Sequence, residues 1–111
     1  MVSKRSGTPF VQRLIEQPLG EGVILEAGAP VARVHYHLSV YQHFSEVEGE
    51  LVPAAIEVEG RVVFRDGIDL ADLQQRQADL TLRLVDGRFL DFSILNADGA
   101  IRSTGRGLFR E

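Results

Sequence analysis

The longest stretch with one clear period runs from residue 31 to residue 44, and it restricts the fold more than any other feature of the sequence. Apolar and polar side chains alternate there, which indicates a β-strand with one buried face, because successive side chains of a strand point to opposite sides. One face holds Ala32, Val34, Tyr36, Leu38, Val40 and Phe44, and the other holds Arg33, His35, His37, Ser39, Tyr41 and His43. The first face is predicted to join the core.

Two neighbouring segments extend this β pattern. The turn residues Gly28-Ala29-Pro30 separate the apolar run 23–25 from the long strand, so the two are predicted to form a hairpin. Residues 54–65 alternate again, with apolar side chains mainly on one face. Gly60 lies in the middle of this segment and predicts either a bulge or a corner at which the strand bends.

The last third of the chain is predicted to be a β-meander with its first turn at residues 86–87. A two-residue turn would leave Phe92 on the same face as Thr81 and Arg83 and would scatter the apolar side chains over both faces. A three-residue loop with Gly87 in the left-handed conformation avoids this. It gathers on one face Leu80, Leu82, Leu84, Leu90, Phe92 and Ile94.

Two helices are predicted. Thr8 and Pro9 fit the start of a helix over residues 9–17, which Pro18 would end, and its apolar stripe would have to pack on the body or on another chain because so short a helix is unstable alone. Asp69 can cap a second short helix that reaches Gln77, although the Gln-rich end of this segment fits a loop equally well.

The fold class that follows is mostly β. A further turn over residues 96–99 keeps Ile101 on the inner face with either two or four residues in the connection, and the strands then number about six. We predict a small six-stranded antiparallel barrel or a two-sheet sandwich, with one helix before the strands and a short one between the third and fourth. Residues 1–8 are predicted to be a flexible tail, and residues 9–111 a single β domain.

Composition and charge argue against several classes of protein. The chain has no cysteine, which excludes disulfides and thiolate ligands and is compatible with a reducing compartment, so we expect a cytoplasmic protein. No signal-peptide pattern and no stretch near the ~18 apolar residues of a membrane span occur, so no membrane association is expected. The net charge is -4, and residues 45–59 hold five Glu and no basic residue, which makes nucleic-acid binding an unfavourable hypothesis. Residues 45–51 are predicted to form a solvated acidic loop.

The pair His35 and His37 is the strongest candidate for metal chemistry. Side chains at i and i+2 of a strand leave the same face about 7 Å apart, and two imidazoles in that arrangement can chelate one ion. Zinc sites use at least three protein ligands, so the pair would need a carboxylate from a neighbouring strand. His43 lies about 20 Å farther along a regular strand and does not complete the site. The alternative to a metal site is a polar strand face exposed to solvent.

A second group of residues predicts an interaction surface. Val85, Phe89 and Leu95 do not fit the inner face of the meander, so they form either an exposed patch or the second packed face of a sandwich strand. Arginines follow the same strands. They are Arg83, Arg102 and Arg106. Surface ion pairs with nearby acids explain this row better than phosphate binding does.

The leading functional hypothesis is a non-catalytic protein-interaction or oligomerisation module, which binds another protein or a second copy of itself. No catalytic residue and no cofactor is assigned, because no motif supplies an activated nucleophile or a phosphate loop. The alternative is a metal-binding or small-ligand-binding β-barrel, an enzyme or a sensor, that uses His35 and His37.

Overall fold

The computed structural model of the chain describes residues 11–76 and 79–111. The predicted tail over residues 1–8 lies outside the described residues. The described part is mostly β, with seven strands and one short helix. The elements are β1 (Val11–Glu16), β2 (Leu19–Glu26), β3 (Ala29–Val47), β4 (Glu50–Gly67), α1 (Leu70–Arg76), β5 (Leu80–Arg83), β6 (Phe89–Ile94) and β7 (Ala100–Ser103).

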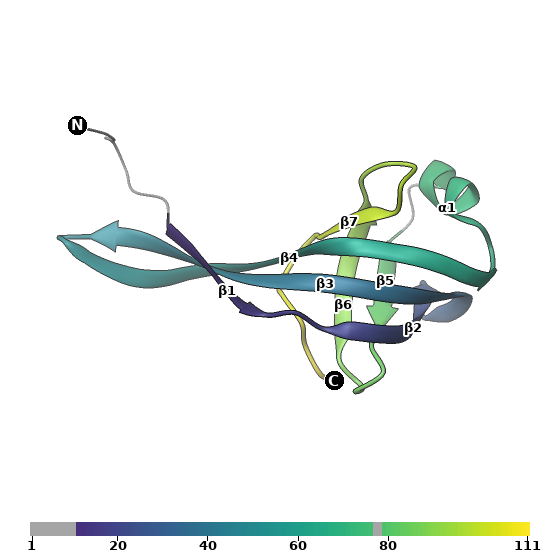
Figure 1. Cartoon of the computed structure of the whole chain (residues 1–111), viewed down its shortest axis with the longest axis horizontal. Coiled ribbons are helices and arrows are strands. Elements are labelled where there is room, and N and C mark those ends of the chain that lie inside the picture. Colours follow the sequence, from purple (N-terminus) through teal and green to yellow (C-terminus); the bar gives the residue numbers. More distant parts are fainter. Residues whose placement is uncertain (1–10, 77–78) are drawn as a thin grey trace.

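The strands form one antiparallel sheet in the order β1-β3-β2-β5-β6-β7-β4, as Figure 1 shows. Because β3 also pairs with β4, the sheet closes partly into a ring. The six predicted strands correspond to β2 through β7. Strand β1 is a seventh strand that pairs with β3 and stands outside the ring.

The core lies inside the ring and follows the predicted alternation of β3. The inner-face residues Ala32, Val34, Tyr36, Leu38 and Val40 are all buried, whereas Phe44 is half-buried because it lies beyond the end of the core. They pack with inward side chains of the other ring strands and of α1. These are Ile24, Val58, Val62, Leu73, Leu80, Leu82, Leu84, Leu90, Phe92 and Ile101. The prediction that one face of this strand joins the core is therefore confirmed.

Strand β4 has a glycine, Gly60, at its middle because the backbone of β3 lies too close to leave room for a side chain there. Gly60 pairs with Leu38 on β3 and with Ile101 on β7. A Cβ atom at this position would collide with the carbonyl oxygen of His37. The register continues past Gly60 without a shift, so the predicted bulge is absent there and the glycine serves the close contact between strands.

The predicted register of the meander is confirmed. Leu82 faces Leu90, and the amide of Leu84 donates to the carbonyl of Arg88 at 2.8 Å, which leaves residues 85–87 as a three-residue loop. Gly87 has a φ of 92°, the left-handed conformation that this loop requires. At the next turn the amide of Leu95 donates to Ala100, so the connection has four residues.

The second predicted helix is also present. The Asp69 carboxylate accepts a hydrogen bond from the Asp72 amide at 2.9 Å, the contact expected of an N-cap residue. Leu73 is buried against the core, as predicted, and Leu70 is half-buried. The helix extends through Arg76, and the predicted end at Gln77 lies outside the described residues. In the described part of the chain, no helix has the length and apolar character needed to cross a bilayer.

The predicted helix over residues 9–17 is wrong, because residues 11–16 form strand β1. This strand pairs antiparallel with β3, from Val11 opposite Phe44 to Glu16 opposite Val40. Strand β2 reaches only His37 along the same edge of β3, so the remaining N–H and C=O groups of β3 need another partner. Pairing with that edge satisfies both chains, whereas a helix of about nine residues is unstable without extensive packing. Residues 9 and 10 lie outside the described residues.

The prediction of an acidic loop over residues 45–51 is also wrong. Strand β3 continues to Val47, Glu48 and Gly49 make a two-residue turn with positive φ at both positions, and β4 begins at Glu50. We define the arm as residues 41–57 of this hairpin together with β1. Figure 1 shows it projecting from the ring, and it contributes to dimensions of 51 × 28 × 21 Å. The radius of gyration, 16.2 Å, exceeds the roughly 13 Å of a compact domain of this length.

Candidate functional site

The two histidines proposed as metal ligands lie on the outer face of β3, as predicted. Nδ1 of His35 lies 2.9 Å from Oε2 of Glu21, which β2 places directly opposite. The Arg65 guanidinium lies 3.5 Å from the same oxygen. The hydrogen bond from His35, and secondarily the charge of Arg65, lower the pKa of Glu21. Glu21 is thus a carboxylate in contact with His35, and the sequence carries no signal for it, because local periodicity does not fix the register between β2 and β3.

His37 is exposed and has a different environment from His35. It lines a shallow cleft together with Ser39, Glu59 and Leu95. Among the residues that the structure describes, no group of three or more His, Cys, Asp or Glu side chains has the spacing to hold a metal ion. Metal binding by His35 and His37 therefore stays a prediction that rests on two imidazoles and on one carboxylate beside His35.

The structure gives Phe89 a neighbour within the chain. The Phe89 and Phe109 rings stack with centroids 5.7 Å apart, and two backbone hydrogen bonds join the same residues. The Arg106 guanidinium lies 3.6 Å from the centroid of the Phe109 ring, within the range of a cation–π contact. Phe89 and Arg106, both predicted interaction residues, thus take part in fixing the C-terminal segment on the sheet.

The other predicted interaction residues do not gather into one patch. Val85 is 73% exposed in the β5–β6 loop, and Leu95 is 47% exposed just after the opposite end of β6, so the strand of about 20 Å separates them. Arg83 is exposed near Val85 in the sequence. Arg102 forms an ion pair with Glu57 at 3.3 Å, as the expectation of surface ion pairing required.

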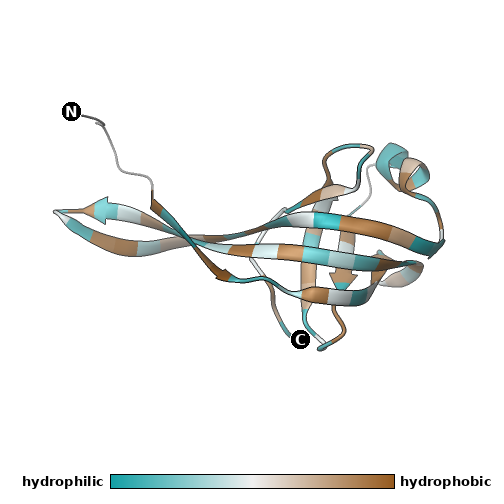
Figure 2. Cartoon of the chain, viewed as in Figure 1, coloured by the Kyte–Doolittle hydropathy of each residue, from teal (hydrophilic) through white to brown (hydrophobic). Residues whose placement is uncertain are grey.

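A larger set of unpacked apolar side chains lies on the arm. Leu14 is 44% exposed and Leu51 is 53% exposed, and Figure 2 shows hydrophobic positions continuing along the arm beyond the ring. The other large apolar residues exposed on the arm are Val11, Ile15, Val47 and Val52. Of residues 41–57, all of which the structure describes, only His43 is buried. The arm therefore has an apolar surface without a core of its own.

The strand edges of the arm are open within the described residues. Strand β1 has β3 as its one neighbour in the sheet, so its outer edge carries unpaired backbone groups. On the other side, β4 pairs with β7 only over residues 59–61. Such edges can accept an additional strand from another chain. Charged side chains on an edge strand, here Arg13 and Glu16, limit uncontrolled pairing with other chains.

His43 forms the polar connection at the base of the arm. Its Nε2 lies 3.0 Å from Oε1 of Glu57, whose other oxygen receives the ion pair from Arg102. A cleft of about 400 Å³ lies beside this pair and is lined by residues 43–45, 54–57 and 103–105. The sequence predicted an exposed His43, but the register of β3 against β4 shifts between Gln42 and Phe44, and His43 is buried.

A cluster of ionic contacts holds β1 to the ring. The Arg88 guanidinium donates to both carboxylate oxygens of Glu16, at 2.9 and 2.6 Å, and to Asp86 at 2.9 Å. These hydrogen bonds lower the pKa of Glu16 and raise the pKa of Arg88. The pKa of Asp86 is lowered first by a hydrogen bond from the backbone N–H of Arg88 and second by the Arg88 guanidinium. The cluster orients β1, because it joins the end of that strand to the β5–β6 loop.

Compared with models of protein families, with curated proteins and with solved structures, the chain shows no significant match in any of the three. Its function is therefore argued from its own surfaces.

Proposed function

We propose that this protein is a non-catalytic interaction module that binds another protein through the arm, with a second copy of itself as the partner. The observation that carries the proposal is the exposed apolar surface on the part of β3 and β4 that extends beyond the core. Leu14 and Leu51 lie on separate strands of the arm, and both are about half exposed. A group of large exposed apolar side chains in one region is typical of interaction sites.

The architecture of the arm supports the same proposal. Small sheets need packing on one face for stability, and the side chains of residues 45–55 of the arm are all exposed. A partner that packs on the arm would bury its side chains, and a strand added at β1 would satisfy the open backbone groups. Both effects stabilise a complex.

A second copy fits because β1 offers the same edge in each chain. Two such edges can pair antiparallel about a two-fold axis, which is the commonest symmetry of homodimers. Each copy would then supply Leu14 and Ile15 near the axis, and the mixed charges of Arg13 and Glu16 would lie close to their counterparts. The acidic tip, with Glu46, Glu48 and Glu50, lies at the far end of the arm from this edge.

The test is the mass in solution over a range of concentrations, measured by sedimentation velocity. The wild-type chain is expected to exceed the monomer mass of 12.3 kDa, and Leu14→Glu is expected to restore that mass while circular dichroism shows an unchanged fold. Val85→Glu is the matched control, because Val85 is more exposed than Leu14 but lies off the arm. A wild-type monomer at every concentration, or an equal effect of both variants, would contradict the proposal.

Metal binding by His35 and His37 is a second candidate function, favoured by the contact between His35 and Glu21. Titration of the imidazole NMR signals with stoichiometric Zn²⁺ or Mn²⁺ tests it, and His43 serves as the internal control. Selective perturbation of His35 and His37 would support a metal site, and unperturbed signals would exclude a tight one. A cytoplasmic location also stays a prediction, based on the absence of cysteine.

A further inference from the structure

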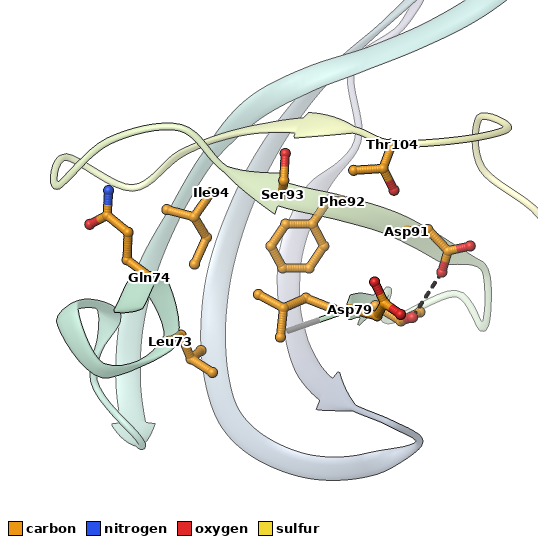
Figure 3. Close-up of a pocket in the computed structure, with 10 residues that line it drawn as sticks. Leu73, Gln74, Asp79, Asp91, Phe92, Ser93, Ile94 and Thr104 are labelled. Atoms are coloured by element: carbon orange, nitrogen blue, oxygen red, sulfur yellow. Dashed lines mark hydrogen bonds between the residues drawn. The ribbon is translucent and has the colours of Figure 1, made fainter. Parts of the chain in front are cut away.

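One edge of strand β6 is covered by a strand over only part of its length. On this edge β6 pairs with β7 from Phe92 onward, and β7 then ends. Figure 3, a view of the neighbouring cleft between α1 and the meander, shows Thr104 just past the end of β7 and near Asp91, whose carbonyl accepts a hydrogen bond from the Thr104 amide at 3.0 Å. The start of β6, at Phe89, needs another partner for its backbone groups, and the segment after β7, residues 104–111, supplies it.

The segment after β7 lies on this edge in the manner of a bound peptide. Phe109 exchanges two backbone hydrogen bonds with Phe89, at 2.7 and 3.0 Å, and its ring stacks on the Phe89 ring. Leu108 packs against the core, and the Arg110 guanidinium donates to the carbonyl oxygen of Asp86 at 3.1 Å. Three consecutive residues thus make an apolar, an aromatic and a cationic contact with the ring.

Few contacts hold this segment in place. Its pairing with β6 is an isolated bridge of one residue pair rather than a strand. The linker that leads to the bridge contains Gly105 and Gly107, and Gly105 has open space around it. Leu108 and both stacked rings are only half-buried. Because each of these contacts contributes a modest free energy, the segment can leave the edge by local opening while the ring stays folded.

We propose that this edge of β6 is a recognition site for an extended peptide of a partner protein, with an apolar residue, an aromatic residue and an arginine in succession. Residues 108–110 occupy the site within the chain, and they show the chemistry that it accepts. A peptide in their place would pair with the backbone of Phe89, stack its ring on the Phe89 side chain and donate from its arginine to Asp86. Strand addition of this kind combines affinity from backbone hydrogen bonds with selectivity from side chains.

The partner is a different protein rather than a second copy of the chain. The short linker keeps residues 108–110 beside their own site at an effective concentration of about millimolar. The same segment of a second copy makes the same contacts, so it does not displace them at lower concentration. A partner peptide displaces them by pairing with more of β6 than the single bridge does. The site lies on the ring and not on the arm, so its test does not depend on the dimer.

The experiment uses the full chain with Phe109→Ala, which removes the ring that occupies the site. The probe is the peptide acetyl-Arg-Gly-Leu-Phe-Arg-Glu-amide, which has the sequence of residues 106–111. Amide NMR shifts on titration are expected at Phe89 and in the loop of residues 85–87. The wild-type chain is expected to bind at least about tenfold more weakly, because its own segment competes. Phe44→Ala removes a half-buried ring on the arm, and this matched control is expected to bind like the wild type.

A second peptide and a second variant complete the test. The peptide with alanine in place of phenylalanine is expected to bind at least about tenfold more weakly, because it cannot stack on Phe89. Phe109→Leu keeps an apolar side chain in case Phe109→Ala affects folding, and it is also expected to bind the probe more tightly than the wild type. Four results would overturn the proposal. They are no binding by either variant at millimolar probe, equal affinity of the wild type and the variants, equal affinity for the two peptides, and shifts confined to the arm.

Discussion

The hairpin of β3 and β4 builds two regions of opposite character, the ring and the arm. The pair of Val40 and Val58 marks the boundary, since both are buried and lie opposite each other. On the ring side, the inner faces of the two strands pack against the other strands and α1. On the arm side, the strands stay paired as far as Val47 and Glu50, but almost every side chain is accessible to solvent.

The comparison of the ring with the arm shows that strands can pair through their backbones where their side chains do not pack. The ladder of β3 and β4 continues through both regions, so backbone pairing extends beyond the part of the strands that packs. Stability differs because the hydrophobic term depends on the area removed from water, and the net contribution of each hydrogen bond is small. The arm is therefore a paired but unpacked extension, and this makes it available for a partner.

Truncation of one leucine in each region tests the difference between the ring and the arm most directly. Leu38 is fully buried in the ring, and Leu38→Ala is expected to lower the free energy of unfolding by about 2–5 kcal/mol, because a cavity remains in the core. Leu51→Ala on the arm is the matched control and, at concentrations where the chain is a monomer, is expected to change it by less than about 0.5 kcal/mol. Urea unfolding at those concentrations measures both. Similar losses there would show that the arm packs within a single chain.

A glycine pair tests the ring at its closest strand contact. Gly60→Ala is expected to cost about 1–3 kcal/mol, because the new methyl group would collide with the backbone of His37. Gly105 has open space around it and no positive φ, so Gly105→Ala is expected to be neutral or slightly stabilising. Thermal and urea unfolding give the difference. A tolerated Gly60→Ala would mean that β3 and β4 lie farther apart than in the structure.

The smallest expected effect concerns the ionic cluster that joins β1 to the ring. The lowered pKa of Glu16 means that its contribution is complete above the pKa of the unfolded chain, about 4.3, and is lost as the pH falls through the lower folded value. Arg88→Gln is expected to return the pKa of Glu16 toward normal and to remove at most about 1 kcal/mol at pH 7, because the Glu16 side chain is 44% exposed and solvent screens the pair.

The same variant gives a local readout of β1. Faster hydrogen exchange is expected at the amides of residues 11–16, and the loss of stability between the wild type and Arg88→Gln is expected to shrink at pH 3. Arg33→Gln, which removes an exposed ion pair with Asp66 outside β1, is the control and should leave these amides unchanged. If exchange in β1 does not respond to Arg88→Gln, backbone pairing with β3 alone holds the strand.

Features that depend on neighbouring residues could be predicted from the sequence. The alternation over residues 31–44 identified the inner face of β3, the apolar register around Gly87 gave the three-residue loop, and Asp69 marked the start of α1. Each follows from a local rule, either the two-residue period of a strand, the loop length that keeps apolar side chains together, or the orphan amides at a helix start.

Features that depend on distant partners are visible only in the tertiary structure. Residues 11–16 carry a pattern that a short helix and an edge strand both satisfy, and the open edge of β3 selects the strand. Phe89 gains its cover from Phe109, and Glu16 gains its partner from Arg88. In each case the deciding contact is remote in the sequence. Local periodicity carries no information about such partners, because the free energy that selects them comes from pairing and burial in the folded chain.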